Sequence, residues 1–383
     1  MRATRAIIHL GNLAHNMQAI RGFIKKGVKI CAAVKADAYG HGAVECSRRL
    51  LAEGADVLAV ATVGEGVELR DAGIHCPILL LSLCAPEEIE EAVRHDITPL
   101  VFDKEYIDLF SMAAEKAGKR GYSVHIAVDS GMGRIGCLPE EAGKIARMLV
   151  DSGKLTIGGT CTHFALSDGT SQEAQEYTQL QYTNFLKAID NIRNEGLEPG
   201  LRHCCASAAS LSHAEMQLDM VRPGIILYGY YADEVDREYL NKLGTPLDLR
   251  PVMTLETEVS AIRRFSRGMS VGYGRTWIAE KDTDIAVLPV GYGDGLLRRW
   301  ASSGLEVAIG GKTYPIRGRV CMDQCMADLG LGSPVHRWDK AVIFGCKADG
   351  AAQDADDIAH ATGTISYEIT SCITRRVPRE FVE

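Results

Sequence analysis

Short apolar runs alternate with longer amphipathic segments over the first 230 residues of the chain. An apolar run bounded by turn residues is typical of a buried strand, and apolar residues at helical spacing are typical of a helix that covers one. This order predicts an α/β fold that begins with an N-terminal (β/α)8 barrel of the TIM type. The predicted strands are Ile30–Lys35, Val57–Val63, Pro77–Leu83, Ile97–Phe102, Ser123–Val128, Thr156–Phe164, Leu201–Ser207 and Leu218–Arg222. The predicted helices include Glu45–Ala52, Gly66–Ala72, Pro86–Arg94, Tyr106–Lys119, Glu140–Leu149 and Gln172–Arg193.

Beyond Tyr231 the pattern changes to strands without regular helices between them. Residues 232–250 are charged and rich in turn residues, which is typical of a linker. We therefore predict a barrel domain over residues 1–240 and a mainly β domain over 241–383, which a strand at about residues 4–10 can join. The strands predicted in it are Val252–Arg263, Ile285–Pro289, Val307–Val320 with a turn at Gly310-Gly311, and Lys340–Phe344, followed by helices at Asp354–Ala361 and Ser366–Arg375.

The composition narrows the class of protein further. The 383 residues carry a net charge of −8, which disfavours binding to nucleic acid or to an anionic membrane surface. There is no apolar run of membrane-spanning length, and the N-terminus has no signal-peptide pattern. Scattered cysteines without a Cys-x-x-Cys pair indicate small buried residues in a reducing cytoplasm, and predict no metal site. Those in strand-like runs are Cys31, Cys161, Cys204 and Cys321.

Polar residues of particular types fall at the ends of the predicted barrel strands. Lys35, His163, Ser207 and Arg222 end four of these strands, and Arg134 follows another. Catalytic groups of such barrels lie at the C-terminal ends of the strands, and the loops after the last two strands commonly bind phosphate. A lysine at this position can be partly desolvated, lose its proton and attack a carbonyl, although most lone lysines at strand ends are simply surface residues.

The segment around this lysine is the most specific motif. It reads Val34-Lys35-Ala36-Asp37-Ala38-Tyr39-Gly40-His41-Gly42 and resembles the cofactor-lysine motif of the alanine racemase family. The resemblance implies that pyridoxal 5'-phosphate forms a Schiff base with Lys35 and that Tyr39 holds its phosphate. It extends from about Arg5 to Val377, nearly the whole chain.

Three further segments resemble the cofactor-binding loops of the same family. In the family pattern, Arg134 of residues 128–136 binds the phenolic oxygen of the cofactor and the substrate, and His163 of residues 162–165 packs on the ring. Arg222 of residues 220–225 faces the pyridine nitrogen. An arginine cannot release its proton there, so the ring remains a weaker electron sink.

The resemblance assigns the phosphate to a separate group of residues. The hydroxyl of Ser207 and the backbone N–H groups of Gly224 and Ile225 correspond to the phosphate ligands of the family. The segment Pro223-Gly224-Ile225 is also expected to open a short helix facing the barrel mouth. Tyr367 corresponds to a tyrosine that binds phosphate and gates the substrate.

Racemisation needs an acid or base on each face of the substrate. Lys35 serves one face, and Val271-Gly272-Tyr273-Gly274-Arg275-Thr276-Trp277 resembles the motif whose tyrosine serves the other from the second subunit of a homodimer. A free tyrosine, with a pKa of about 10, is a poor base, so the family pairs it with the positions of His163 and Arg222. Met322 and Tyr292 lie in motifs that resemble the substrate-binding loops.

Two positions depart from the family pattern. Ala127 stands where the family commonly has a lysine, often carbamylated, and Ala206 stands where it usually has an asparagine before the phosphate-binding serine. The negative charge of the modified lysine would balance Arg134. We expect water or a small anion such as chloride beside Ala127 instead, or else a neighbouring carboxylate.

The resemblance implies a cytoplasmic, two-base alanine racemase that supplies D-alanine for peptidoglycan. Racemisation of serine or another small amino acid on the same scaffold remains open, as does a cofactor-binding protein with weak turnover. Barrel-type amino-acid decarboxylases share the first-strand lysine but need an acidic partner for the ring nitrogen, where this chain offers Arg222.

Overall fold

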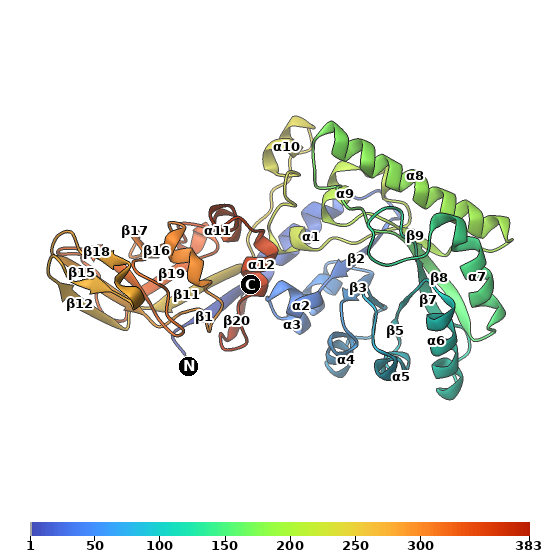
Figure 1. Cartoon of the computed structure of the whole chain (residues 1–383), viewed down its shortest axis with the longest axis horizontal. Coiled ribbons are helices and arrows are strands. Elements are labelled where there is room, and N and C mark those ends of the chain that lie inside the picture. Colours follow the sequence, from blue (N-terminus) through green and yellow to red (C-terminus); the bar gives the residue numbers. More distant parts are fainter. Residues whose placement is uncertain (1) are drawn as a thin grey trace.

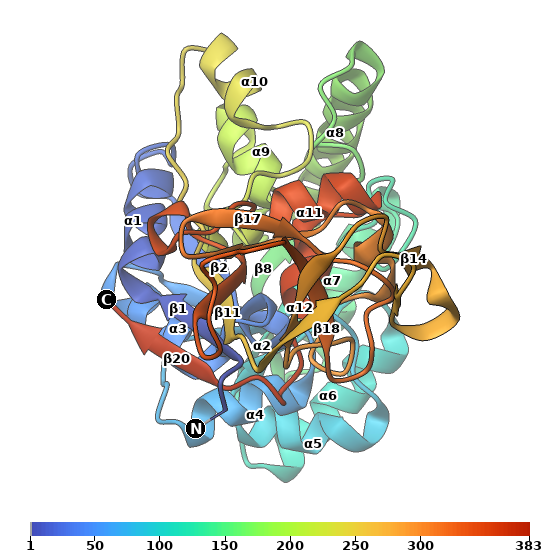
Figure 2. The same ribbon diagram turned by 90° about the vertical axis from the view of Figure 1, so that its left-hand side faces the viewer.

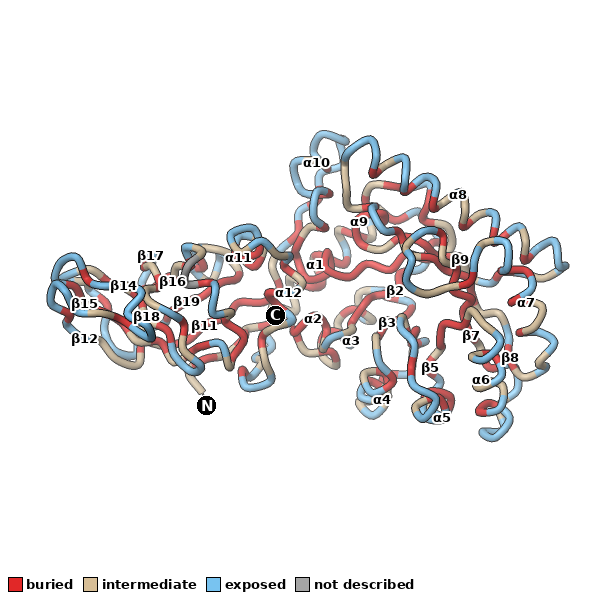
Figure 3. Tube along the Cα trace, in the orientation of Figure 1, coloured by how far each residue is buried: buried red, intermediate tan, exposed pale blue. Residues whose placement is uncertain are grey.

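The computed structural model describes residues 2–383, with only the backbone at 301 and 302. The chain forms a TIM-type barrel joined to a β-rich part, which lies on the left of Figure 1 and in front of the barrel in Figure 2. Figure 3 shows buried residues along the barrel strands and exposed residues on the outer faces of the helices. Among the helices of residues 2–383, none is long and apolar enough to cross a lipid bilayer.

Parallel strands form the wall of the barrel. Met220 of the last strand pairs with Lys29 of the first, which closes the ring on one side. Pro99 interrupts the wall because proline has no N–H, yet its carbonyl still accepts a hydrogen bond from the N–H of His125 at 2.9 Å. The strands are β2 (Lys29–Ala33), β3 (Val57–Val60), β4 (Ile78–Leu80), β5 (Ile97–Thr98), β6 (Leu100–Val101), β7 (Tyr122–Ala127), β8 (Leu155–Cys161), β9 (Leu201–His203) and β10 (Met220–Val221).

The six barrel helices that the apolar periodicity predicts are present within a few residues of their predicted bounds, whereas α1 and α9 were not predicted. Polar caps fix several of their starts: Thr62 forms a capping box with Glu65, and Asp103 and Ser171 cap the helices that follow them. The helices are α1 (Leu10–Arg21), α3 (Ala43–Ala52), α4 (Val63–Asp71), α5 (Pro86–Arg94), α6 (Lys104–Lys116), α7 (Ala142–Asp151), α8 (Gln172–Asn194) and α9 (Ser207–Ser212), with a 3-10 turn η3 at Ile225–Tyr228.

The second part is built on a sheet with the strand order β17-β16-β19-β11-β1-β20. Strand β1 (Arg5–His9) lies between β11 and β20, so the N-terminal strand pairs within this sheet. The other strands of this sheet are β11 (Met253–Glu258), β16 (Glu306–Ile309), β17 (Lys312–Pro315), β19 (Lys340–Phe344) and β20 (Arg379–Val382). A smaller sheet holds β12 (Ala261–Phe265), β15 (Thr283–Leu288) and β18 (Cys325–Gly330), and a hairpin joins β13 (Ser270–Val271) to β14 (Trp277–Ile278).

Several predicted boundaries were wrong. The predicted strand Val252–Arg263 is two strands, and the second strand of the predicted Val307–Val320 hairpin ends at Pro315, so that Cys321 lies in a loop. The linker contains a helix, α10 (Arg237–Lys242), and the C-terminal helices are α11 (Ala355–Thr362) and α12 (Ser366–Ser371).

The barrel strands are also shorter than predicted at the mouth. Lys35 begins a turn after β2, His163 lies two residues beyond β8, Ser207 begins α9, and Arg222 directly follows β10. Apolar residues continue past each last ladder bond, so hydrophobicity alone extended these strands too far. The candidate residues therefore lie on loops and helix starts at the mouth.

Candidate functional site

A cavity of about 440 Å³ opens at the C-terminal mouth of the barrel. It brings together most of the residues that the sequence singled out. Ile225 is buried beside it, at the start of η3. The predicted residues that line the cavity are Lys35, Tyr39, Arg134, His163, Ser207, Arg222, Gly224 and Tyr367, together with Ala127 and Ala206.

Lys35 and Tyr39 are held at the two ends of a left-handed helical turn, α2 (Lys35–Tyr39). The four residues from Ala36 to Tyr39 have φ angles of 53–54°, although none of them is glycine. L-residues pay about 1–2 kcal/mol each for this conformation, so surrounding contacts must fix it. Glu65 of α4 is one such contact, because its Oε1 accepts a hydrogen bond from the N–H of Ala36 at 2.7 Å.

His41, a residue of the motif to which the sequence assigned no role, is a second contact that fixes this turn. Its buried ring donates from Nδ1 to the carbonyls of Ala38 at 2.9 Å and Tyr39 at 3.0 Å. Burial lowers the pKa of His41 to about 4, so the ring stays neutral at physiological pH. The His41 ring also stacks on Tyr228, with the ring centroids 4.7 Å apart.

The environment of Lys35 favours its neutral form. Burial, followed by the positive charge of Arg134, lowers the pKa of the Lys35 amine, while Glu65 acts in the opposite direction. A neutral amine is the form that attacks carbonyls and accepts protons. The lowered pKa therefore makes the neutral, nucleophilic form of Lys35 easier to reach than in a solvent-exposed lysine.

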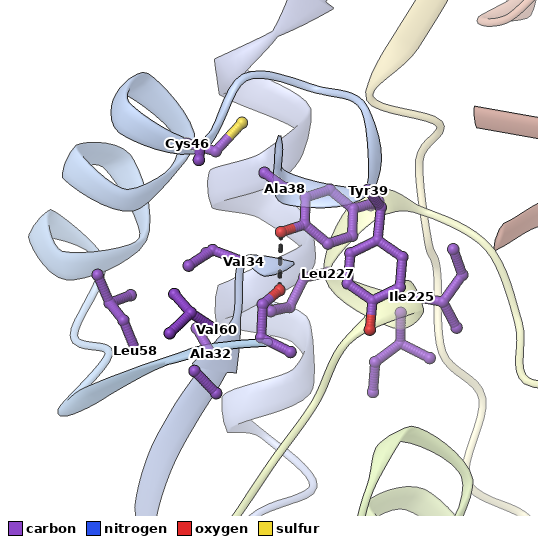
Figure 4. Close-up of a cluster of buried hydrophobic side chains, with 14 of the residues drawn as sticks. Ala32, Val34, Ala38, Tyr39, Cys46, Leu58, Val60, Ile225 and Leu227 are labelled. Atoms are coloured by element: carbon purple, nitrogen blue, oxygen red, sulfur yellow. Dashed lines mark hydrogen bonds between the residues drawn. The ribbon is translucent and has the colours of Figure 1, made fainter. Parts of the chain in front are cut away.

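Tyr39 packs against other aromatic rings at the barrel mouth. Its ring is 5.0 Å from that of Tyr228 and 5.8 Å from that of Tyr367, and it belongs to a buried cluster with Ala38 and Ile225 (Figure 4). Burial raises the pKa of Tyr39, so its hydroxyl stays protonated and can donate a hydrogen bond.

Arg222 is held by the His163 segment, which the sequence singled out, and by His203 and His125, which it did not. Its Nη2 donates to the carbonyl of Thr162 at 2.8 Å and lies 3.3 Å from Nδ1 of His163. Its Nη1 donates to Nδ1 of His203 at 2.7 Å, and Nε2 of His203 lies 2.8 Å from Nδ1 of His125. Since Nδ1 of His203 accepts, its Nε2 carries the proton and donates to His125.

These histidines are all neutral in this setting. Burial and the charge of Arg222 lower the pKa of His163 to about 3 and that of His125 to about 4. The same two causes lower the pKa of His203 well below its usual value. Arg222 is thus a fixed positive charge that is buried in the cavity wall and surrounded by neutral acceptors.

The end of the cavity near β9 and β10 is small and lined by polar groups. The N–H of Gly224 donates to Oγ of Ser207 at 2.9 Å. Ala206 occupies the N-cap of α9, where it offers no side-chain oxygen, whereas an asparagine would cap the helix. A Cβ atom at Gly224 would lie 2.5 Å from Oη of Tyr39, so only glycine lets these elements approach.

The loop that carries Arg134 is held by α8 and by its own turn. Oδ1 of Asp129 accepts from the N–H groups of Gly131 and Gly133, and Oη of Tyr177 donates to the Gly131 carbonyl at 2.7 Å. Arg134 itself is exposed, whereas Ala127 is buried. The Arg134 guanidinium is therefore accessible to solvent, while the methyl group of Ala127 is not.

Three predicted residues lie apart from this cavity. Tyr273 and Met322 are 67% and 52% exposed, and Tyr292 is 42% exposed; none of them lines the cavity of its own chain. The N–H of Tyr292 donates to the carbonyl of Cys321 at 3.0 Å, which joins the Tyr292 and Met322 loops, and a Cβ atom at Gly274 would contact Arg319 beside them. They form one surface of the β-rich part.

A partly desolvated lysine, a serine hydroxyl and a buried arginine in one cavity at the mouth of a TIM-type barrel, beside a β domain, are typical of the class of barrel-type pyridoxal-phosphate enzymes. Models of the N-terminal and C-terminal domains of alanine racemase match residues 8–232 and 252–381. The chain belongs to the alanine racemase family.

Relatives and solved structures agree along the full length. An alanine racemase of Treponema denticola is 47% identical over 100% of this chain and 99% of the relative, and one of Treponema pallidum is 39% identical over 100% of both. A solved alanine racemase of Clostridium difficile superposes with a TM-score of 0.90 at 35% identity, covering 100% of this chain and 96% of that one. One from Streptomyces coelicolor gives 0.91 at 34% identity, covering 100% and 98%.

The alanine racemase family uses pyridoxal phosphate, and the cavity fits this cofactor. Lys35 offers the amine for the aldehyde, and the small end at Ser207 and Gly224 offers a hydroxyl and backbone N–H groups in a space that a Cβ at Gly224 would close. Arg222 in the wall adds a guanidinium whose orientation is fixed by its bond to His203.

Proposed function

We propose that this chain interconverts L-alanine and D-alanine with pyridoxal phosphate as cofactor. The observation that carries the proposal is the cavity in which the lowered-pKa amine of Lys35, the hydroxyl of Tyr39 and the anchored Arg222 meet. When bound, pyridoxal phosphate supplies a conjugated system that takes up the negative charge left by the departing α-proton.

In this proposal the residues of the chain divide the work. Lys35 holds the cofactor and moves a proton on the face of D-alanine, while Tyr273 moves one on the face of L-alanine. Arg222 and His163 hold the ring in place, and Arg134 binds the phenolic oxygen of the cofactor and the substrate carboxylate. Arg222 stays protonated, which keeps the ring a weaker electron sink and limits side reactions.

The phosphate end is proposed as a separate anchor. The hydroxyl groups of Tyr39 and Tyr367 donate hydrogen bonds to the phosphate. The other proposed donors are the hydroxyl of Ser207 and the backbone N–H groups of Gly224 and Ile225. Because the anchor is remote from the reacting carbon, it supplies binding energy that orients the ring.

We further propose that the active protein is a homodimer. Tyr273, Tyr292 and Met322 are exposed and lie outside the cavity of their own chain, so they can act only in the site of another copy. The partner's Tyr273 then faces Lys35, and Met322 and Tyr292 of the partner subunit contact the substrate. Light scattering coupled to size exclusion should give twice the chain mass, and a fully active monomer would contradict the dimer.

The domain boundary is refined within the same proposal. A boundary between residues 240 and 241 would cut α10, so we place it between Lys242 and Met253, where no regular element lies.

We also propose that the protein acts in the cytoplasm, where D-alanine is made for peptidoglycan.

The reaction is tested by an assay that separates the two enantiomers of alanine. Purified protein with pyridoxal phosphate is incubated with L-alanine, and D-alanine is followed by chiral chromatography; the reverse direction is run in parallel. We expect both directions to reach an equal mixture. L-serine in a matched reaction tests the alternative substrate, and carbon dioxide release tests the decarboxylase alternative. If the protein binds the cofactor but forms no racemised alanine or serine and releases no carbon dioxide, only the alternative of a cofactor-binding protein with weak turnover remains.

A further inference from the structure

Arg379, on strand β20 of the β-rich part, makes an unusual set of contacts. Its Nε donates to the carbonyl of Gly40 at 3.0 Å, directly after the left-handed turn. Its Nη1 donates to the carbonyls of Thr374 and Val377, each at 2.7 Å, and its Nη2 donates to that of Ile373 at 2.6 Å. One guanidinium thus joins the cofactor-lysine loop of the barrel to the segment that follows α12.

This arginine is placed for geometry and not for charge pairing. Within residues 2–383, no direct ion pair to a carboxylate involves Arg379, and burial lowers its pKa, although the negative charge of Asp37 acts in the opposite direction. Removing a guanidinium from water without a counter-charge is costly unless its donors are satisfied. Four backbone carbonyls accept from four of its five N–H donors here, and the planar fork of arginine can reach all four carbonyls at once.

The β-rich part also packs closely against this loop at two glycines. Gly40 has a φ of 86°, and a Cβ atom there would lie 2.2 Å from the carbonyl oxygen of Thr370 on α12. Gly42 has a φ of 95°, and a Cβ atom there would lie 2.7 Å from Cζ of Phe381 on β20. The two glycines of the motif therefore allow α12, which carries Tyr367, and β20 to contact the loop.

We propose that Arg379 is a positioning residue that fixes the left-handed turn carrying Lys35 and Tyr39 in register with Tyr367 on α12. The turn is strained in isolation. The carbonyl of Gly40 at its end receives the hydrogen bond from Arg379 only when β20 packs against the barrel. Loss of Arg379 frees Gly40 and lets the turn relax, so the lysine amine and the phosphate-binding hydroxyls lose their common alignment. The proposal rests on the proposed function only in naming what Lys35 and Tyr39 bind.

Hydrogen exchange of the full chain tests the tie directly. The variants are Arg379→Met, which removes the donors, and Arg379→Lys, which keeps the charge but not the fork. Arg375→Met is the control, because Arg375 is an exposed arginine four residues earlier. Exchange of the amides of residues 36–42 is measured by mass spectrometry with and without pyridoxal phosphate, and the dissociation constant of pyridoxal phosphate is measured by titration.

We expect both Arg379 variants to exchange residues 36–42 about tenfold faster than wild type in the cofactor-free chain, and to bind pyridoxal phosphate about tenfold more weakly. The control should match wild type in both. If Arg379→Met does not accumulate as folded protein, Arg379→Lys decides. Unchanged exchange in residues 36–42 for the folded Arg379 variants, or equal acceleration in the control, would overturn the proposal.

These results are separable from the proposed function. The exchange measurement needs neither racemase activity nor bound cofactor, so a wild-type chain that fails to racemise alanine would leave the exchange result standing. Conversely, normal exchange in the Arg379 variants would leave the racemase proposal intact.

Discussion

Nη1 of Arg222 donates a hydrogen bond to Nδ1 of His203 over 2.7 Å, so the arginine that faces the cavity is oriented by a histidine behind it. That histidine can accept the bond only while it is neutral, and it is in turn bonded to His125 at 2.8 Å. The orientation of Arg222 thus depends on the protonation of two buried rings.

Replacing His125 tests this hydrogen-bond network through the pH dependence of the unfolding free energy. Burial lowers the folded pKa of His125 to about 4, so the unfolded chain takes up the proton first as the pH falls below about 6.5. The stability from a neutral His125 is present above pH 6.5 and is lost as the pH falls toward 4. His125→Gln should therefore reduce the slope of the unfolding free energy between pH 6.5 and 4.5 by up to about 1.4 kcal/mol per pH unit.

The measurement is urea unfolding at several pH values, with His75→Gln as the control because His75 is exposed. The control should keep the wild-type slope. A His125→Gln slope equal to that of wild type would show that His125 titrates normally in the folded protein.

Lys35→Ala should abolish covalent attachment of the cofactor. Borohydride fixes pyridoxal phosphate to the amine that holds it, and peptide mass spectrometry then finds the modified residue. We expect the modification on Lys35 in wild type and its loss in the variant. Lys29→Ala, at the exposed start of β2, should keep the full yield. An undiminished yield in Lys35→Ala would remove Lys35 from this role.

Tyr273→Phe should bind cofactor normally and lose racemisation in both directions. The variant keeps the ring and removes only the hydroxyl, and a positioned acid or base contributes about 10²–10⁴-fold to the rate. The measurement is kcat from L-alanine and from D-alanine. Tyr239→Phe, on α10 and outside the cavity, is the control. Turnover near that of wild type would exclude the two-base mechanism.

Activity should depend on the anion present, since Ala127 leaves Arg134 without the family's carbamylated lysine. Arg134 is exposed, and an exposed charge contact is worth about 1 kcal/mol or less, so replacing chloride by gluconate at constant ionic strength should change kcat/KM by about fivefold or less. Anomalous diffraction from bromide-soaked crystals would locate the ion. A carboxylate on Arg134 together with identical rates in both salts would contradict the anion.

The fold followed from local patterns, whereas parts of the site depend on contacts between distant segments. Helices such as α5 and α8 were found because their apolar periodicity and N-terminal signals are local. The end of β9 was misplaced because Cys204 and Cys205 are apolar and buried but lie beyond His203, the last residue of the strand that pairs with β8. Hydrophobicity marks burial, while a strand ends where its neighbour's hydrogen bonds end.

The residues that line the cavity came from the family motif, and their supports did not. The left-handed turn at 36–39 contains no glycine, so no local rule signals it; Glu65 and His41 impose it from outside. His203 and His125 lie in apolar strands 78 residues apart and become neighbours only in the closed barrel. One signal was available for His41, because it stands inside the motif between two glycines.

The exposure of Tyr273, and its distance from the cavity of its own chain, has a consequence for mixed assemblies. In the proposed dimer each site takes Lys35 from one copy and Tyr273 from the other. Two inactive variants, Lys35→Ala and Tyr273→Phe, would then complement each other: in a heterodimer both substitutions meet in one site, and the other site is entirely wild type. Co-expression of two dead alleles would restore activity in about a quarter of all sites if subunits pair at random.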